Sequence, residues 1–208
     1  GKRYRHDQVH NLFGYYMTRA ASEAFERYVP EKRILLFSRA SYIGMHRFGG
    51  IWQGDNASRW SHLKMNVKMM PSLNMCGFLY TGADVGGFGA DATEDLVLRW
   101  LEFAVFTPLL RNHSARGTRR QEVYCFSHVE KFADVIGVRY QILPYIYSEY
   151  MKAALRNTMM FNPLAFLYGE DALARQVEDQ LFIGENVMVA PVCEQNVSGR
   201  VVFIFRKE

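Results

Sequence analysis

Apolar positions along the chain fall into two recurring patterns, a helical period and short unbroken runs. Over residues 9–24 they return every three or four positions, which predicts an amphipathic helix that ends before Pro30. An almost wholly apolar run over residues 33–37 follows, a pattern typical of a strand covered on both faces. The first part of the chain therefore predicts a helix followed by a buried strand.

Two further helix and strand pairs are predicted in the middle of the chain. Ser58 is a suitable N-cap for a helix that ends before Pro71, and the apolar run over residues 75–80 predicts the next buried strand. Thr93 can cap another helix, and the run over residues 105–110 predicts a third strand. The predicted inward face of the helix after Thr93 consists of Leu96, Val97, Trp100, Leu101 and Ala104.

The pattern changes in the last third of the chain. A long helical pattern covers residues 129–155, and Pro144 inside it predicts a kink because proline lacks a backbone donor. Beyond this helix, short apolar runs predict strands over residues 164–168, 187–192 and 201–205. We therefore divide the chain into an α/β domain over residues 1–157 and the start of a β-rich domain over residues 158–208.

Alternating helices and buried strands predict parallel strands joined by crossover helices, in an open sheet or a closed barrel. A barrel is favoured because polar motifs follow the strands and no Gly-x-Gly-x-x-Gly fingerprint does. The expected fold class is α/β, the C-terminal part of a (β/α)8 TIM barrel followed by the start of a β-sandwich domain. An eight-stranded barrel takes about 250 residues, so we expect the chain to be a piece of a longer protein.

Composition and charge exclude several classes of protein. The chain has 208 residues, 49% of them hydrophobic, and a net charge of +4, so it is neither disordered nor collagen-like. No apolar run reaches the roughly 20 residues of a membrane span, and four arginines within residues 111–120 are too few for a nucleic-acid stripe. We therefore expect neither a membrane nor a nucleic acid as partner. Widely spaced Cys76, Cys125 and Cys193 indicate free thiols and a cytoplasmic location.

The most informative polar motif contains Arg39, Trp52 and Asp55, which lie after the first predicted strand. Tryptophan stacks on sugar rings, and arginine binds hydroxyls or carboxylates. An aspartate beside an indole is poorly solvated, which favours the protonated form that a general acid needs. Gly-Asp-Asn is also an ordinary turn sequence, so composition alone leaves a catalytic and a structural interpretation open.

Two more polar motifs follow the next two predicted strands. Residues 82–89 place four glycines around Asp84 and Phe88 and lack the Lys-Ser/Thr of a Walker loop. A loop that approaches a ligand is favoured over a phosphate cradle, with a plain turn about equally compatible. Arg111 and His113 follow the third strand, and His113 could bind a hydroxyl or orient a carboxylate. No spacing of His or Cys indicates a metal site.

Five motifs follow one another along the chain: Ser38-Arg39, Trp52-x-Gly54-Asp55-Asn56, Gly82-x-Asp84-x-Gly86-Gly87-Phe88, Arg99-Trp100 and Arg111-x-His113. In this order and spacing they resemble glycoside hydrolase family 31, the α-glucosidase and α-xylosidase family. The resemblance extends from the first predicted helix into the β-rich tail.

The resemblance implies a retaining hydrolase that removes non-reducing-end α-linked glucose from oligosaccharides, with no metal or organic cofactor. Asp55 matches the family's general acid/base at the end of the sixth barrel strand. Four residues match positions that line the sugar pocket and two match supporting positions: Arg39, Trp52, Phe88 and His113, and Asp84 and Arg111.

The family's nucleophile is an aspartate in an Asp-Met-Asn-Glu-like motif upstream of the first helix, and residues 1–7 contain no such motif. Asp7 lies at the start of the helix and is not a substitute. We therefore expect the N-terminal half of the same enzyme as a partner and no turnover by these residues alone. The alternative is a non-catalytic carbohydrate-binding or scaffold protein of the same fold. The sequence leaves glucosidase or xylosidase specificity and a homo-oligomer open.

Overall fold

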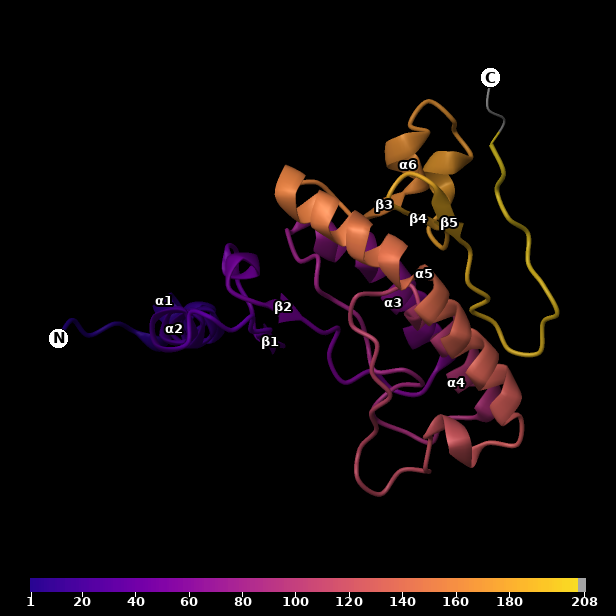
Figure 1. Ribbon diagram of the computed structural model, residues 1–208, viewed down its shortest axis with the longest axis horizontal. Helices are drawn as coiled ribbons and strands as arrows, with labels where there is room; N and C mark the ends of the chain where they lie inside the picture. The colour runs from indigo at the N-terminus through magenta and orange to yellow at the C-terminus, as the bar shows by residue number, and fades with distance from the viewer. Residues whose placement is uncertain (206–208) are drawn as a thin grey trace.

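The computed structural model describes residues 1–205. Its helices are α1 (His6–Val9), α2 (Leu12–Tyr28), α3 (Trp60–Met75), α4 (Glu94–Ala104), α5 (Val129–Arg156) and α6 (Leu164–Leu167). Its strands are β1 (Phe37–Ser38), β2 (Gly50–Ile51), β3 (Phe161–Pro163), β4 (Leu181–Ile183) and β5 (Val187–Val189). Three short 3-10 turns are η1 (Met45–Arg47), η2 (Val123–Cys125) and η3 (Ala174–Gln176). In Figure 1, α3, α4 and α5 form the main body, and α1 and α2 lie to one side of it.

Four chain segments form a parallel ladder in sequence order. The first two are β1 and β2, with Phe37 opposite Gly50. The third segment spans residues 80–85 and the fourth spans residues 109–111. Backbone N–H groups continue the ladder across them: Ile51 donates to Tyr80 O (3.1 Å), Leu109 to Thr81 O (3.2 Å) and Val85 to Arg111 O (2.8 Å). The predicted parallel arrangement is therefore correct, but the apolar pattern predicted three strands in this region and did not predict β2. Regular strand is confined to β1 and β2 in this part of the chain.

The extents of the predicted strands in this ladder are wrong. In the run over residues 33–37 only Phe37 is in a strand, and residues 105–110 contain no strand. The run over residues 75–80 begins on the last residue of α3 and turns at Gly77, whose φ is +88°. The run over residues 33–37 was also expected to be covered on both faces, but Ile34, Leu35 and Phe37 are 39%, 56% and 40% exposed. An apolar run is therefore compatible with a helix end or a loop as well as with a buried strand.

The boundaries of α3 also differ from the prediction. Arg59 is its N-cap, and the hydroxyl of Ser58 donates instead to Ala90 O (3.0 Å). The helix continues through Pro71 to Met75. Proline removes one backbone donor from a helix, but α3 nevertheless continues past the buried Pro71.

The predicted N-cap of α4 is confirmed. The hydroxyl of Thr93 accepts a hydrogen bond from Leu96 N–H (3.3 Å), and Glu94 and Asp95 lie in the first turn. Every residue of the predicted inward face is buried, and Phe103 joins them.

We expect Thr93→Ala to lower the free energy of unfolding by about 1 kcal/mol, measured by urea denaturation. Thr93→Ser keeps the hydroxyl and is the control; an equal loss in both variants would contradict capping.

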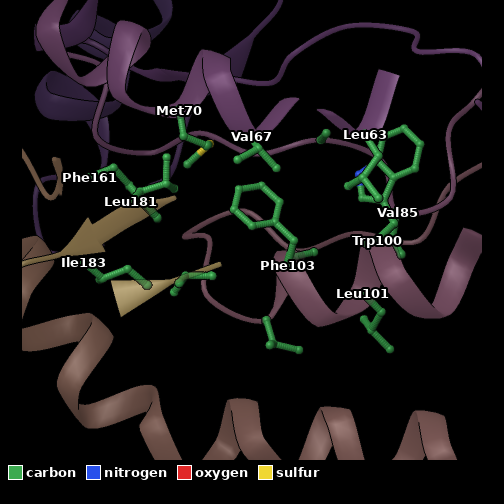
Figure 2. Close-up of a cluster of buried hydrophobic side chains, with 14 of the residues drawn as sticks. Leu63, Val67, Met70, Val85, Trp100, Leu101, Phe103, Phe161, Leu181 and Ile183 are labelled. Carbon is green, nitrogen blue, oxygen red and sulfur yellow. The ribbon is translucent and has the colours of Figure 1, made fainter. Parts of the chain in front are cut away.

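One core joins the helices to the C-terminal sheet. Figure 2 shows Leu63 and Met70 of α3 and Trp100 of α4 directed toward the same buried cluster as Phe161 and Ile183 of the sheet. All five side chains are at most 1% exposed. The helices and the C-terminal sheet therefore bury apolar side chains against each other. Removing this apolar surface from water stabilises the contact between the two parts of the chain.

The β-rich part contains a three-stranded antiparallel sheet in the order β3-β4-β5. β5 lies inside the predicted strand over residues 187–192, whereas β3 and β4 were not predicted. The predicted strand over residues 164–168 is wrong, since residues 164–167 form α6, and no strand is assigned within the described residues 201–205. Short apolar runs do not distinguish a buried helical turn from a strand.

Asn74, near the end of α3, ties the two parts together. Its side chain is buried, and its Oδ1 accepts hydrogen bonds from the N–H groups of Met160 (3.0 Å) and Phe161 (2.9 Å). Its Nδ2 donates to Phe78 O (3.0 Å). One carboxamide thus fixes the start of the C-terminal sheet against the turn that leads from α3 into the third ladder segment.

Candidate active site

The polar motifs all lie at one edge of the parallel ladder. Arg39 follows β1, and Asp55 follows β2. Asp84 ends the third segment and forms a parallel bridge with Arg111 of the fourth. The carboxyl ends of parallel segments meet at one edge, so residues separated by more than seventy positions come together. None of the helices in the described chain is long and apolar enough to cross a membrane.

Arg39 and Asp55 form an ion pair at this edge. Arg39 Nη1 donates to Asp55 Oδ2 at 2.9 Å, and the two side chains are 60% and 44% exposed. Gly54 precedes the aspartate with a φ of +83°, a conformation that favours glycine and turns the chain toward Arg39. The expectation of a poorly solvated Asp55 is therefore wrong for this structure, because water and a guanidinium both reach its carboxyl group.

Asp84 and Arg111 form a second, more buried ion pair. Arg111 Nε donates to Asp84 Oδ1 at 2.7 Å, and the Asp84 side chain is only 1% exposed. Burial raises the pKa of Asp84, and the hydrogen bond and charge of Arg111 oppose that rise without cancelling it. Asp84 was expected to hold Arg39 or His113 in place; the partner it binds is Arg111.

The guanidinium of Arg111 also contacts two aromatic rings. Its central carbon lies 5.6 Å from the ring centre of Trp52 and 5.7 Å from that of Phe37. The two rings meet edge to face with their centres 6.0 Å apart. Cation–π attraction therefore fixes Trp52 beside Arg111. Phe37 is a site residue that the sequence analysis missed, because its apolar run indicated only a buried strand.

Phe88 and His113 form a third pair. Their ring centres lie 5.2 Å apart, with the planes tilted by 32°. The N–H groups of Phe88 and Gly89 both donate to Asn56 O, at 2.7 and 3.0 Å. The glycine-rich loop is thus bound to the loop of Asp55. Because these N–H groups already have acceptors in the protein, they are not available to cradle a phosphate.

Two other site residues act on the pKa of Asp84. A positive charge on His113 lowers this pKa and the charge of Asp55 raises it, both less than burial and Arg111 do. The bridge between Asp84 and Arg111 and the hydrogen bonds from Phe88 and Gly89 to Asn56 O place the three pairs in one site. In the part of the chain that the structure describes, no three His, Cys, Asp or Glu side chains gather in a way that could hold a metal ion.

Comparison with known proteins identifies the family. The family profile for the glycosyl hydrolases family 31 TIM-barrel domain matches residues 1–149. The profile for the glycosyl hydrolase family 31 C-terminal domain matches residues 157–207. The chain belongs to glycosyl hydrolase family 31. The expected fold, part of a TIM barrel followed by a second domain, is confirmed.

Relatives in sequence are α-glucosidases. Alpha-glucosidase 2 of Bacillus thermoamyloliquefaciens is 35% identical over 202 residues, which are 95% of this chain and 25% of that protein. Human neutral alpha-glucosidase AB is 31% identical over 204 residues, 97% of this chain and 22% of that protein. The chain therefore spans about a quarter of the length of these relatives.

Similar structures belong to enzymes of the same family. A Tris-bound glucosidase II alpha subunit has a TM-score of 0.87 at 31% identity, covering 93% of this chain and 22% of that chain. The GH31 dextranase of Flavobacterium johnsoniae, in complex with isomaltotriose, has a TM-score of 0.85 at 29% identity, covering 92% and 25%. A further structure shows glucosidase II as a heterodimer of a catalytic subunit and the binding domain of a regulatory subunit.

Proposed function

We propose that the protein is a retaining α-glycoside hydrolase, similar to α-glucosidases, that releases α-linked glucose from the non-reducing end of oligosaccharides. Family membership and the names of its relatives support this reaction class. The observation that carries the proposal is the gathering of Asp55, Arg39 and the Asp84–Arg111 pair at one edge of the ladder.

In this proposal Asp55 is the general acid/base. It protonates the departing glycosidic oxygen in the first step and activates water in the second. The described hydrogen bond of Asp55 uses Oδ2, so the other oxygen, Oδ1, is available to the substrate. A second carboxylate must attack the anomeric carbon from about 5–5.5 Å away, and we place it in the N-terminal half of the same enzyme.

The remaining site residues bind and orient the sugar. The exposed guanidinium of Arg39 and the imidazole of His113 donate to sugar hydroxyls, and these hydrogen bonds tighten as the ring flattens toward an oxocarbenium ion. Trp52 and Phe88 supply flat apolar surface for the ring faces. The Asp84–Arg111 pair holds Trp52 in place through the contact between the Arg111 guanidinium and the Trp52 ring.

The test is hydrolysis by the full-length protein. We expect release of glucose from maltose or isomaltose, with the α-anomer appearing first when the reaction is followed by proton NMR, because two displacements retain configuration. A xylosyl analogue of each substrate tests the space around the C6 hydroxymethyl. Binding of these sugars without turnover would contradict the proposal and indicate a carbohydrate-binding protein of the same fold.

A further inference from the structure

We propose that Gln121 is a positioning residue whose side-chain amide holds the two loops of the candidate active site in register. The inference rests on the proposed function, because the two loops carry residues assigned to it. One loop contains Asp84 and Phe88, and the other contains Arg111 and His113. Gln121 belongs to neither loop, and no motif in the sequence singles it out.

The amide of Gln121 lies between the two loops. Its side chain is buried, with 2% of the residue exposed. Nε2 donates to Val85 O and Gly87 O, both at 3.0 Å, in the glycine-rich loop. The same nitrogen lies 3.2 Å from Asn112 Oδ1 and 3.4 Å from His113 O in the other loop. Two protons are thus shared among four acceptors, two on each loop.

The link is reciprocal on the side of the second loop. Asn112 Nδ2 donates to the backbone oxygen of Gln121 at 2.7 Å, while Asn112 Oδ1 faces Gln121 Nε2. Asn112 lies between Arg111 and His113 in the sequence. Its position therefore determines where the side chains of these two neighbours leave the backbone. Because buried polar groups must find partners, loss of the amide would leave four oxygens competing for water that has little access.

The glycine-rich loop is shaped to receive this amide. Gly86 has a φ of +84°, and a Cβ there would lie 2.8 Å from Val97 Cγ2 and 3.4 Å from Gln121 Nε2. The backbone therefore passes close against both side chains. The two hydrogen-bonded carbonyls, of Val85 and Gly87, flank this glycine, so Gln121 fixes the turn that separates Asp84 from Phe88.

The relative position of the two loops matters for catalysis because two pairs of site residues each have one member on either loop. Asp84 binds Arg111 across the gap, and the Phe88 ring lies 5.2 Å from that of His113. Direct backbone hydrogen bonds also join the loops, from Val85 N–H to Arg111 O and from Ala115 N–H to Phe88 O. Without Gln121 these two links remain, so the loops stay attached but the tips that carry Phe88 and His113 lose their fixed spacing.

The first test is Gln121→Met in the full-length protein. Methionine keeps the volume and removes every donor, and a displacement of about 1 Å at a sugar pocket can cost on the order of 100-fold in rate. We expect kcat/KM for maltose to fall roughly 10- to 100-fold, expressed per active site from titration with a tight-binding inhibitor. A purely structural role would reduce the fraction of folded protein. Expressing the rate per titrated active site removes that effect, so a remaining loss reports the geometry of the site.

Gln180→Met is the matched control. Gln180 is also 2% exposed, and it also bonds through its amide, donating to Phe203 O at 3.1 Å and accepting from Phe203 N–H at 2.8 Å. It lies in the C-terminal part and touches neither site loop in these hydrogen bonds. We expect it to lower the thermal midpoint but to keep kcat/KM per active site within about twofold. Similar rate losses in both variants would overturn the proposal.

Gln121→Glu gives a second readout that does not depend on the methionine variant folding. A carboxylate at this position faces four oxygen acceptors, whereas a protonated carboxyl donates to one of them. The ratio of variant to wild-type kcat/KM should therefore rise as the pH is lowered. A ratio that is flat with pH, or a Gln121→Met variant with wild-type kcat/KM, overturns the positioning role. Wild-type protein that hydrolyses no glucoside would instead contradict the proposed function.

Discussion

Asp55→Asn in the full-length protein should reduce kcat/KM for maltose by about 10² to 10⁴-fold. An amide cannot deliver a proton to the departing sugar oxygen, and a sugar alkoxide is a poor leaving group without one. A dinitrophenyl α-glucoside needs little protonation, so its first step should remain within about tenfold of wild type. Comparing the two substrates separates proton donation from binding, because both place the same glucose in the pocket.

The second step offers an independent measurement on the same variant. Without a base, water attacks the glycosyl-enzyme slowly, whereas azide needs no base. Added azide should therefore speed turnover of the dinitrophenyl substrate and yield a glycosyl azide of retained configuration. Asp134→Asn, at an exposed aspartate of α5, is the control and should match wild type. Equal losses on both substrates, with no effect of azide, would rule out the acid/base role of Asp55.

Arg111→Met should lower the free energy of unfolding by about 3 kcal/mol at neutral pH. The change leaves the carboxylate of Asp84, which is 1% exposed, without the guanidinium that binds its Oδ1. It also removes the cation from the faces of Trp52 and Phe37. Arg99→Met is the matched control, because Arg99 pairs with Glu102 on the half-exposed face of α4 and such pairs contribute roughly 0–1 kcal/mol.

The stability lost in Arg111→Met should depend on pH, and the pKa of Asp84 determines the direction. Burial raises the pKa of Asp84 above its ordinary value of 3.8, so the folded protein binds this proton more tightly than the unfolded chain. The associated stability is present below 3.8 and is lost as the pH rises through the raised pKa. Removing Arg111 raises that pKa further, so Arg111→Met should cost more at neutral pH than in acid.

A double-mutant cycle tests the cause. In Asp84→Asn/Arg111→Met no buried charge remains, so the double variant should recover most of the stability that Arg111→Met loses. Its unfolding free energy should also lose the pH dependence that belongs to Asp84. A double variant as unstable as the sum of the two single variants would show that the pair acts by packing and not by charge compensation.

Local signals and motif order predicted much of the fold and of the candidate site. The N-cap at Thr93 and the buried face of α4 depend only on residues in and next to that helix. The spacing of these residues was therefore enough to locate α4. Parallel segments share one edge, so motifs that follow successive strands had to meet, as Asp55, Asp84 and His113 do. These predictions needed only periodicity and the geometry of parallel strands.

The predictions that failed depended on tertiary contacts. The apolar run over residues 75–80 begins at the end of α3, where Met75 is 56% exposed, and residues 164–167 form a helix instead of a strand. The partner of Asp84 was predicted wrongly from sequence as Arg39 or His113, because nothing local indicates that Arg111 of the neighbouring segment reaches it. Gln121 carries no local signal, since its role depends on four oxygens from two distant loops.

The carboxamide of Asn74 has a mechanical consequence. It joins a helix end to the first strand of the C-terminal sheet across more than eighty residues of sequence, within one shared core. The two parts therefore cannot swing about residues 157–158 without breaking buried hydrogen bonds and separating packed apolar surface. The helices α3, α4 and α5 and the C-terminal sheet therefore form one mechanically coupled unit, whose buried contacts must break before its two parts can separate.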